Sequence, residues 1–175
     1  MPQKHFDFNP VDHITTGAIG PPGKRVFYLQ ARKNKEVVTL IIEKIQIQSL
    51  AVGVEKYLQE LAEQKPELPA ASADYTEDEM ALETPIDPAF RAGQIGLGYD
   101  EESDRIVIVA REISNDESDE EEGGLARFWA TRSQILALSR YGLEVANRGR
   151  PICPHCGEPI NSEGHFCPKR NGHKR

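Results

Sequence analysis

Residues 93–145 read GQIGLGYDEESDRIVIVAREISNDESDEEEGGLARFWATRSQILALSRYGLEV, and this stretch decides the fold. Strands are expected over 90–99, 105–110 and 126–130, because apolar and β-branched residues there are bounded by turn residues. The hydrophobic period then changes to that of a helix. Thr131 stands at the expected N-cap, and the apolar stripe that follows contains Ile135, Leu138, Gly142 and Val145. The stretch therefore predicts three strands followed by one helix.

The first part of the chain repeats this order. Strands are expected over 11–19, 25–32 and 36–42, with a strong turn at residues 20–23. A helix follows, and its expected buried stripe contains Ile47, Leu50, Ala51, Val54, Leu58 and Leu61. The two helices align with Gln46 on Gln134, and Gly17-Ala18-Ile19-Gly20 resembles Gly93-Gln94-Ile95-Gly96. We interpret the similarity as an internal duplication.

The predicted fold class is α+β, with two duplicated antiparallel strand-rich modules, each closed by a helix. An approximate internal twofold axis follows if each module buries its sheet face and helix stripe against its twin. The predicted domains are a first module over 1–64, an acidic Pro/Ala linker over 65–88, a second module over 89–149 and a Cys/His tail over 150–175. An acidic loop is placed at 114–124 within the second module, and Thr76 is expected to cap a short turn in the linker. The nearly unbroken apolar strand over 105–110 is expected to be central and covered on both faces.

Charge and hydropathy exclude several classes of protein. The net charge is −7, and residues 150–175 carry five basic and two acidic side chains, which leaves −10 for residues 1–149. Such a body is a poor nucleic-acid binder. No apolar run approaches the roughly 20 residues of a membrane helix, and the amino terminus lacks the apolar stretch of a signal peptide. We therefore expect a cytoplasmic protein that does not enter the membrane.

The tail predicts a metal site. Cys153 and Cys156 have the spacing of a chelating turn, and Cys167 supplies a third sulfur. Zinc takes four tetrahedral sulfur or nitrogen ligands, so one histidine is needed. We favour His173, with His165 as the alternative. Four protein ligands leave no position for a reacting water, so the predicted zinc is structural, and it could fold a tail that is too short to form its own core.

No catalytic constellation stands out in the sequence, so the first hypothesis is a non-enzymatic adaptor or regulatory protein that binds another protein. The second is an enzyme, or an enzyme subunit, that acts on a phosphorylated or nucleotide-like metabolite between the modules, with Arg25, Arg105 and Arg127 as candidate anion-binding residues. The third is weak nucleic-acid contact through the basic residues of the tail.

The tail motif also carries a resemblance. The run Gly149-Arg150-Pro151-x-Cys153-Pro154-x-Cys156-Gly157-x-Pro159, followed by Gly164-His165-x-Cys167-Pro168-x-x-Asn171-Gly172-His173, resembles the end of an uncharacterised bacterial family of internally repeated proteins. Residues 93–100 and 104–108 resemble the second-repeat signature of the same family. The family is a domain of unknown function, so the resemblance implies an architecture, a cytosolic bacterial setting and a Cys/His tail, but no reaction.

We predict one zinc ion per chain, because three clustered thiolates and one imidazole complete a tetrahedral site. Elemental analysis of the purified protein checks the stoichiometry. Cys153→Ser or Cys156→Ser should each release the metal, and His173→Ala should weaken zinc retention more than His165→Ala. Loss of zinc from His165→Ala alone would assign the fourth ligand to His165 instead.

Overall fold

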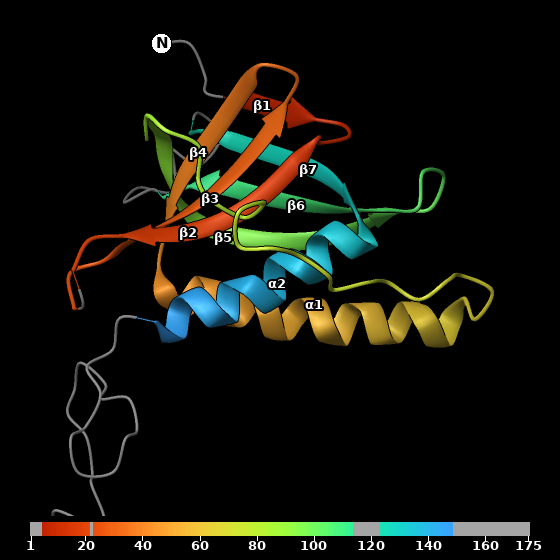
Figure 1. The fold of residues 1–175 in the computed structure, drawn as a ribbon. Helices are drawn as coiled ribbons and strands as arrows, with labels where there is room; N and C mark the ends of the chain where they lie inside the picture. The colour runs from red at the N-terminus through yellow and green to blue at the C-terminus, as the bar shows by residue number, and fades with distance from the viewer. Residues whose placement is uncertain (1–4, 22, 114–122, 149–175) are drawn as a thin grey trace, which may run out of the picture.

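The computed structural model describes residues 5–21, 23–113 and 123–148, which form a mixed α+β fold (Figure 1). The elements in chain order are β1 (His5–Phe8), β2 (His13–Ile19), β3 (Val26–Lys33), β4 (Glu36–Ile42), α1 (Lys44–Gln64), β5 (Pro88–Asp100), β6 (Arg105–Glu112), β7 (Leu125–Thr131) and α2 (Arg132–Asn147). Both helices and the six strands expected in the two modules are present. None of these helices is long and apolar enough to span a membrane.

All described strands belong to one sheet, whose order is β1-β7-β6-β5-β4-β3-β2. The meanders β2-β3-β4 and β5-β6-β7 are antiparallel, as predicted. The joins β4-β5 and β1-β7, which connect one predicted module to the other, are parallel, and the sequence made no prediction for them. A parallel pair needs a long crossover, and α1 with the segment after it supplies the one between β4 and β5.

The chain between β1 and β2 brings the two ends of this strand order together. Phe8 lies opposite Phe128 on β7 at the end of β1. The Val11 amide then donates to the Trp129 carbonyl (2.8 Å), and the Asp12 amide donates to the Arg32 carbonyl on β3 (2.7 Å). Residues 5–19 therefore pass from β7 to β3 through a bend between β1 and β2, and this passage closes the curved sheet on itself.

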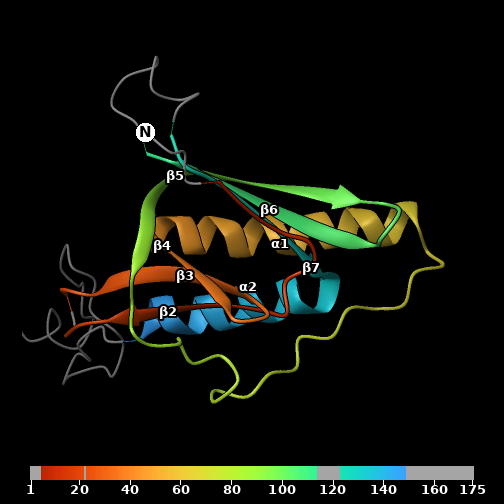
Figure 2. The same ribbon diagram turned by 90° about the horizontal axis from the view of Figure 1, so that it is seen from above.

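The helices α1 and α2 lie side by side against one face of the sheet (Figures 1 and 2). The predicted stripe of α2 is confirmed, because all four of its residues are buried. In α1, Ile47, Ala51, Val54 and Leu61 are buried, whereas Leu50 and Leu58 are only partly buried against the core. The hydrophobic periods of the sequence thus identified the core-facing side of each helix.

A glutamine at the start of each helix ties it to the sheet. Thr131 caps α2 as predicted, since its hydroxyl accepts from the Gln134 amide (3.0 Å) while the Gln134 side chain accepts from the Thr131 amide (2.8 Å). The Gln134 Nε2 also donates to the Asp12 carbonyl (3.3 Å). In α1, the Gln46 Nε2 donates to the Gly93 carbonyl (3.1 Å) at the corresponding place on β5. The start of α1 is therefore held by β5, and the start of α2 is held by Asp12, which directly precedes β2.

The connecting segment, residues 65–87, has no helix or strand, but it packs on the protein as it runs back past α2 and β2 (Figure 2). The Ser72 amide donates to the Ser133 hydroxyl (2.9 Å), and the Tyr75 ring packs edge-on to Tyr141. Thr76 accepts from the Glu79 amide (3.2 Å), so the expected cap holds a single turn. Met80 is 4% exposed. Part of this segment is therefore built into the core.

Two helical glycines are expected to respond in opposite ways to substitution by alanine. A Cβ at Gly142 would lie 2.9 Å from the Ile47 Cγ2, whereas a Cβ at Gly53 would meet only Leu97 Cδ1 at 3.8 Å. Overpacking costs about 1–3 kcal/mol, and Gly→Ala in a helix gains roughly 1 kcal/mol. We expect Gly142→Ala to lower the free energy of unfolding by about 1 kcal/mol, and Gly53→Ala to raise it by up to about 1 kcal/mol, in urea titrations. Stabilisation by both substitutions would show that α1 and α2 do not pack closely at Gly142.

Candidate functional site

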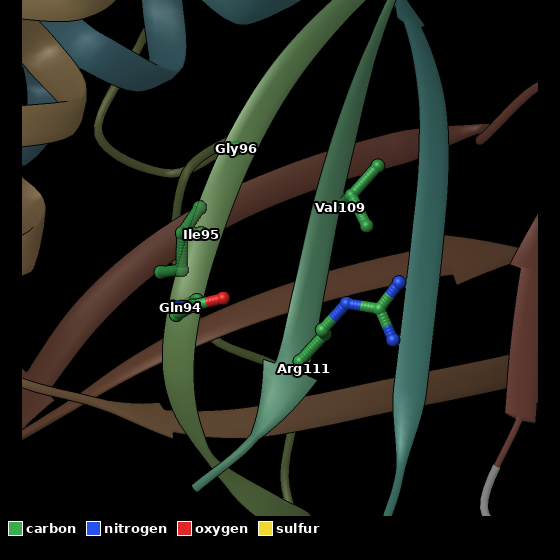
Figure 3. A pocket seen from close by; sticks show the side chains of 5 residues that line it. All are labelled: Gln94, Ile95, Gly96, Val109 and Arg111. Atoms are coloured by element: carbon green, nitrogen blue, oxygen red, sulfur yellow. The ribbon is translucent and has the colours of Figure 1, made fainter. Parts of the chain in front are cut away.

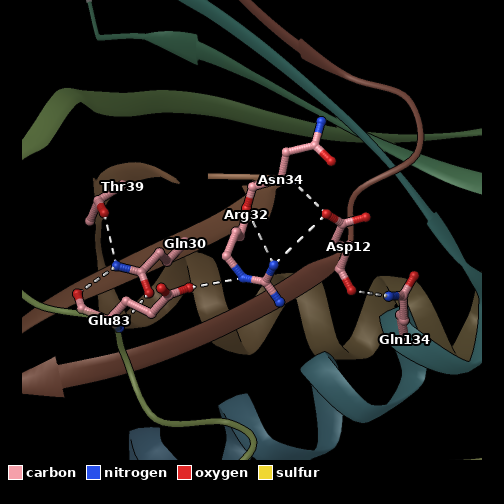
Figure 4. A network of polar contacts seen from close by, with 7 residues as sticks. All are labelled: Asp12, Gln30, Arg32, Asn34, Thr39, Glu83 and Gln134. Carbon is pink, nitrogen blue, oxygen red and sulfur yellow. Dashed lines mark hydrogen bonds and ion pairs between the residues drawn. The ribbon is translucent and has the colours of Figure 1, made fainter. Parts of the chain in front are cut away.

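The outer face of β2-β3-β4, which points away from the helices, is covered by the connecting segment (Figure 4). The Thr15 hydroxyl donates to the Met80 carbonyl (2.6 Å). The Gln30 side chain pairs with both backbone groups of Glu83: its Nε2 donates to the carbonyl (3.1 Å) and its Oε1 accepts from the amide (2.7 Å). The same Nε2 donates to the Thr39 hydroxyl (3.0 Å). The face thus binds an extended piece of chain through its backbone.

Side chains of the segment also contact this face, through an ion pair and through close packing. The Glu83 carboxylate lies 3.2 Å from the Arg32 Nε, and Asp12 approaches the same guanidinium at 3.8 Å (Figure 4). Leu82 occupies the space beside Gly17, where a Cβ would lie 2.8 Å from the leucine Cγ. Gly17 is therefore needed for the close approach of Leu82 to β2, and Arg32 binds the carboxylate of Glu83.

The corresponding face of β5-β6-β7 is open in the part of the chain that the structure describes. Cross-strand pairing arranges its residues in rows: Gln94, Arg111 and Leu125 in one, then Gly96, Val109, Arg127 and Asp7, then Gly98, Val107 and Trp129. An open hollow of about 430 Å³ lies over the first two rows (Figure 3). A Cβ at Gly96 would meet no atom within 4 Å. We name this surface the open face.

The expectation that the apolar strand over 105–110 is covered on both sides was therefore wrong for the described residues. Ile106, Ile108 and Ala110 are fully buried on the helix side of β6, but Val107 and Val109 on the open face are only half-buried. Valine is common both in covered strands and on partly exposed sheet faces, so the sequence could not distinguish the two situations.

Two arginines of the open face differ in their partners. Arg127 forms a two-pronged ion pair with Asp7 (2.7 and 2.6 Å), and its guanidinium lies 5.5 Å from the centre of the Trp129 ring. The hydrogen bond from Arg127 lowers the pKa of Asp7 below its ordinary value. Arg111 is exposed and extends toward β7, and it forms no ion pair with any described residue (Figure 3). Arg111 is therefore an exposed cation of this face that can take an external anion.

The three candidate anion-binding arginines do not come together. Arg25 lies at the end of α2, where its Nη1 donates to the carbonyls of Val145 (3.5 Å) and Arg148 (3.2 Å). A cation there stabilises the carboxyl end of a helix. Arg105 begins β6, and Arg127 is paired with Asp7. Sequence reasoning missed Arg111 and Gln94, although the alternation of β6 places Arg105, Val107, Val109 and Arg111 on one side of the strand.

The predicted zinc ligands Cys153, Cys156, Cys167 and His173, and the alternative His165, lie outside the described residues, as does most of the acidic loop predicted at 114–124. Within residues 5–21, 23–113 and 123–148, no group of three or more His, Cys, Asp or Glu side chains is placed to hold a metal ion. The sequence predicts one metal site, which is in the tail, and that site remains a prediction.

A comparison with protein families finds one model that matches residues 6–167, and its description is "Protein of unknown function (DUF3090)". The match spans both meanders, both helices and the first part of the tail, up to Cys167. No curated protein and no solved structure matches the chain.

The Asp7–Arg127 pair predicts a pH dependence of stability. Because the pKa of Asp7 is lowered in the folded protein, the pair stabilises the fold above the ordinary value of 3.8, and this contribution disappears as the pH falls through the lowered value. Both side chains are about half-exposed, so we expect Asp7→Asn to cost less than about 1 kcal/mol at pH 7. Urea titrations between pH 7 and pH 2 should show the wild type approaching the variant as acid is added. Parallel curves at every pH would contradict this role for Asp7.

Proposed function

The chain belongs to the DUF3090 family, and we propose that it is a non-enzymatic adaptor or regulatory protein that binds another protein through the open face. The observation that carries this proposal is the difference between two corresponding faces of one sheet. The face of β2-β3-β4 is covered by residues 80–83 of the chain itself, and the face of β5-β6-β7 is left open by the described residues. An exposed surface that combines half-buried valines with an unpaired arginine is suited to a protein partner.

Two aspartates of the described residues are held in ion pairs that join elements of the fold. Asp7 with Arg127 joins β1 to β7, and Asp104 with Arg132 joins the β5-β6 turn to α2. Arginine hydrogen bonds lower the pKa of both aspartates, which makes these carboxylates poor general bases near neutral pH. The separation of Arg25, Arg105 and Arg127 further weakens the hypothesis of a phosphorylated metabolite held between the modules.

The body of the adaptor is proposed to be an internal duplication with an approximate twofold axis, in which β2-β3-β4-α1 and β5-β6-β7-α2 are copies. The strand registers support this and give the correspondence. When Gln46 is matched to Gln134, the cross-strand pairs match Arg32 to Arg111 and Gly17 to Gly98. The sequence comparison matched Gly17 to Gly93, whereas the strand registers match Gly17 to Gly98. The two matches differ because the turns of the two copies differ in length.

The tail is proposed to hold one structural zinc ion, through Cys153, Cys156, Cys167 and His173 or, alternatively, His165. Clustered thiols of this kind are kept reduced in the cytoplasm, where we place the protein. The zinc-bound tail would give the adaptor a second contact surface.

The adaptor hypothesis predicts that capture depends on the open face. A Gly96→Glu bait adds bulk and negative charge where a side chain meets no atom within 4 Å, so it should remain folded and lose its partner. Val52→Glu also introduces a glutamate, at an exposed position of α1, and serves as the matched control. Quantitative mass spectrometry of captures from native lysate measures the difference.

We expect at least one stoichiometric protein to be retained by the wild type and by Val52→Glu, and to be lost with Gly96→Glu. Equal recoveries with all three baits, or no stoichiometric partner with any of them, would count against the proposed function.

A further inference from the structure

We infer that the open face binds an extended acidic segment of another protein, held in the way residues 80–83 are held on β2-β3-β4. This inference rests on the proposed function and adds the chemical class of the partner. The chain itself provides the template, because the covered and open faces occupy corresponding positions in one sheet.

The template uses three kinds of contact. A glutamine amide, that of Gln30, pairs with the amide and the carbonyl of one residue, which recognises any extended backbone. A guanidinium, that of Arg32, takes the carboxylate of the same residue, Glu83. A glycine, Gly17, leaves room for the preceding apolar side chain, that of Leu82. A short peptide with an apolar residue followed by an acidic one satisfies all three contacts.

The open face presents the same three groups. Arg111 corresponds to Arg32, and Gly98 corresponds to Gly17. The Val107 Cγ1 lies 2.9 Å from where a Cβ of Gly98 would be, so the room for an apolar side chain is beside Gly96, on the same side of β5. Val109 stands where Gln30 stands, so the glutamine must come from elsewhere, and Gln94 lies directly across from Arg111. Cross-strand partners are about 4.5–5.5 Å apart at Cα, and residues two apart on one strand are roughly 6.5 Å apart. Gln94 and Arg111 therefore have nearly the spacing of Gln30 and Arg32.

Charge selects an acidic partner over a neutral or basic one. Arg127 is already neutralised by Asp7, whereas Arg111, like Arg105 at the other end of β6, has no ion-pair partner among the described residues. An Arg–carboxylate pair can be two-pronged and is strengthened where the pair is partly shielded from water. The half-buried Val107 and Val109 supply apolar surface next to it. One carboxylate beside one apolar side chain completes this site.

The test uses a fluorescently labelled synthetic peptide with the sequence of residues 78–87, DEMALETPID, and the full-length protein. Fluorescence anisotropy should show binding to the wild type with a Kd between about 10 μM and about 1 mM, which is typical of a short segment on a small surface. Arg111→Glu and Gly96→Glu should each weaken binding at least tenfold, and Val52→Glu should leave it unchanged. Gln94→Ala should weaken binding less than Arg111→Glu does.

The decisive experiment reverses the charge of both the peptide and the protein. A peptide in which the glutamate corresponding to Glu83 is replaced by lysine should bind Arg111→Glu and fail to bind the wild type. Restoration of this kind requires direct contact, and it also shows that the Arg111→Glu protein is folded.

Three results would overturn the inference. The first is the absence of peptide binding to the wild type. The second is binding that is insensitive to Arg111→Glu, which would place the peptide on β2-β3-β4 by exchange with the chain's own segment. The third is binding that appears only after the six acids of residues 116–122 are neutralised, which would assign the face to that run. If the peptide fails but lysate capture still depends on Gly96, the adaptor function stands and only the partner class is wrong.

Discussion

The structure depends on the passage of residues 5–19 from β7 to β3. A sheet of this order without that passage would end in two exposed edges, and exposed edges pair readily with other chains. The hydrogen bonds of Val11 to Trp129 and Asp12 to Arg32 join both ends instead. The same passage places the Asp12 carbonyl where Gln134 can reach it, so the closure of the sheet also fixes the start of α2.

The parallel joins follow from this closure. If two antiparallel meanders are to share one closed sheet, the last strand of each must lie beside the first strand of the other. The pair β4-β5 meets this requirement directly, and β7 meets it through β1, which continues along the chain into β2; both pairs are parallel. Each helix then leaves the end of its own meander and crosses the same side of the sheet, where α1 and α2 bury Ile47 against Gly142. One geometric constraint thereby accounts for the strand directions and for the position of the helix pair.

Local patterns were enough to predict the elements but not their partners. The helical stripe of Ile135, Leu138, Gly142 and Val145 and the Thr131 cap were confirmed, because period and capping depend on neighbouring residues. The parallel joins depend on residues far apart in the chain, which no local pattern encodes. The site was missed for a related reason. The residue types at positions 107 and 109 do not show whether another segment covers Val107 and Val109. Local sequence also does not show that Arg25 donates to Val145 or that Arg127 pairs with Asp7.

The chemistry of the two outer faces explains why one is permanently covered and the other is suited to reversible binding. On the covered face, Thr15, Gln30 and Thr39 are 1–3% exposed, and removal of residues 80–83 would break the hydrogen bonds that Thr15 and Gln30 make to that segment. A buried polar group left without a partner costs about 1–3 kcal/mol, which favours continuous occupancy. The corresponding residues on the open face are Gly96, Val109 and Arg127.

None of these three residues depends on an occupant of the open face. Gly96 has no side chain, Val109 has no polar group, and Arg127 is already satisfied by Asp7. These three positions therefore bear no comparable penalty when the face is empty, so a partner can leave them without destabilising the fold there. A protein that keeps one face filled by its own chain and the other free of such penalties has the physical properties that an exchangeable binding site requires.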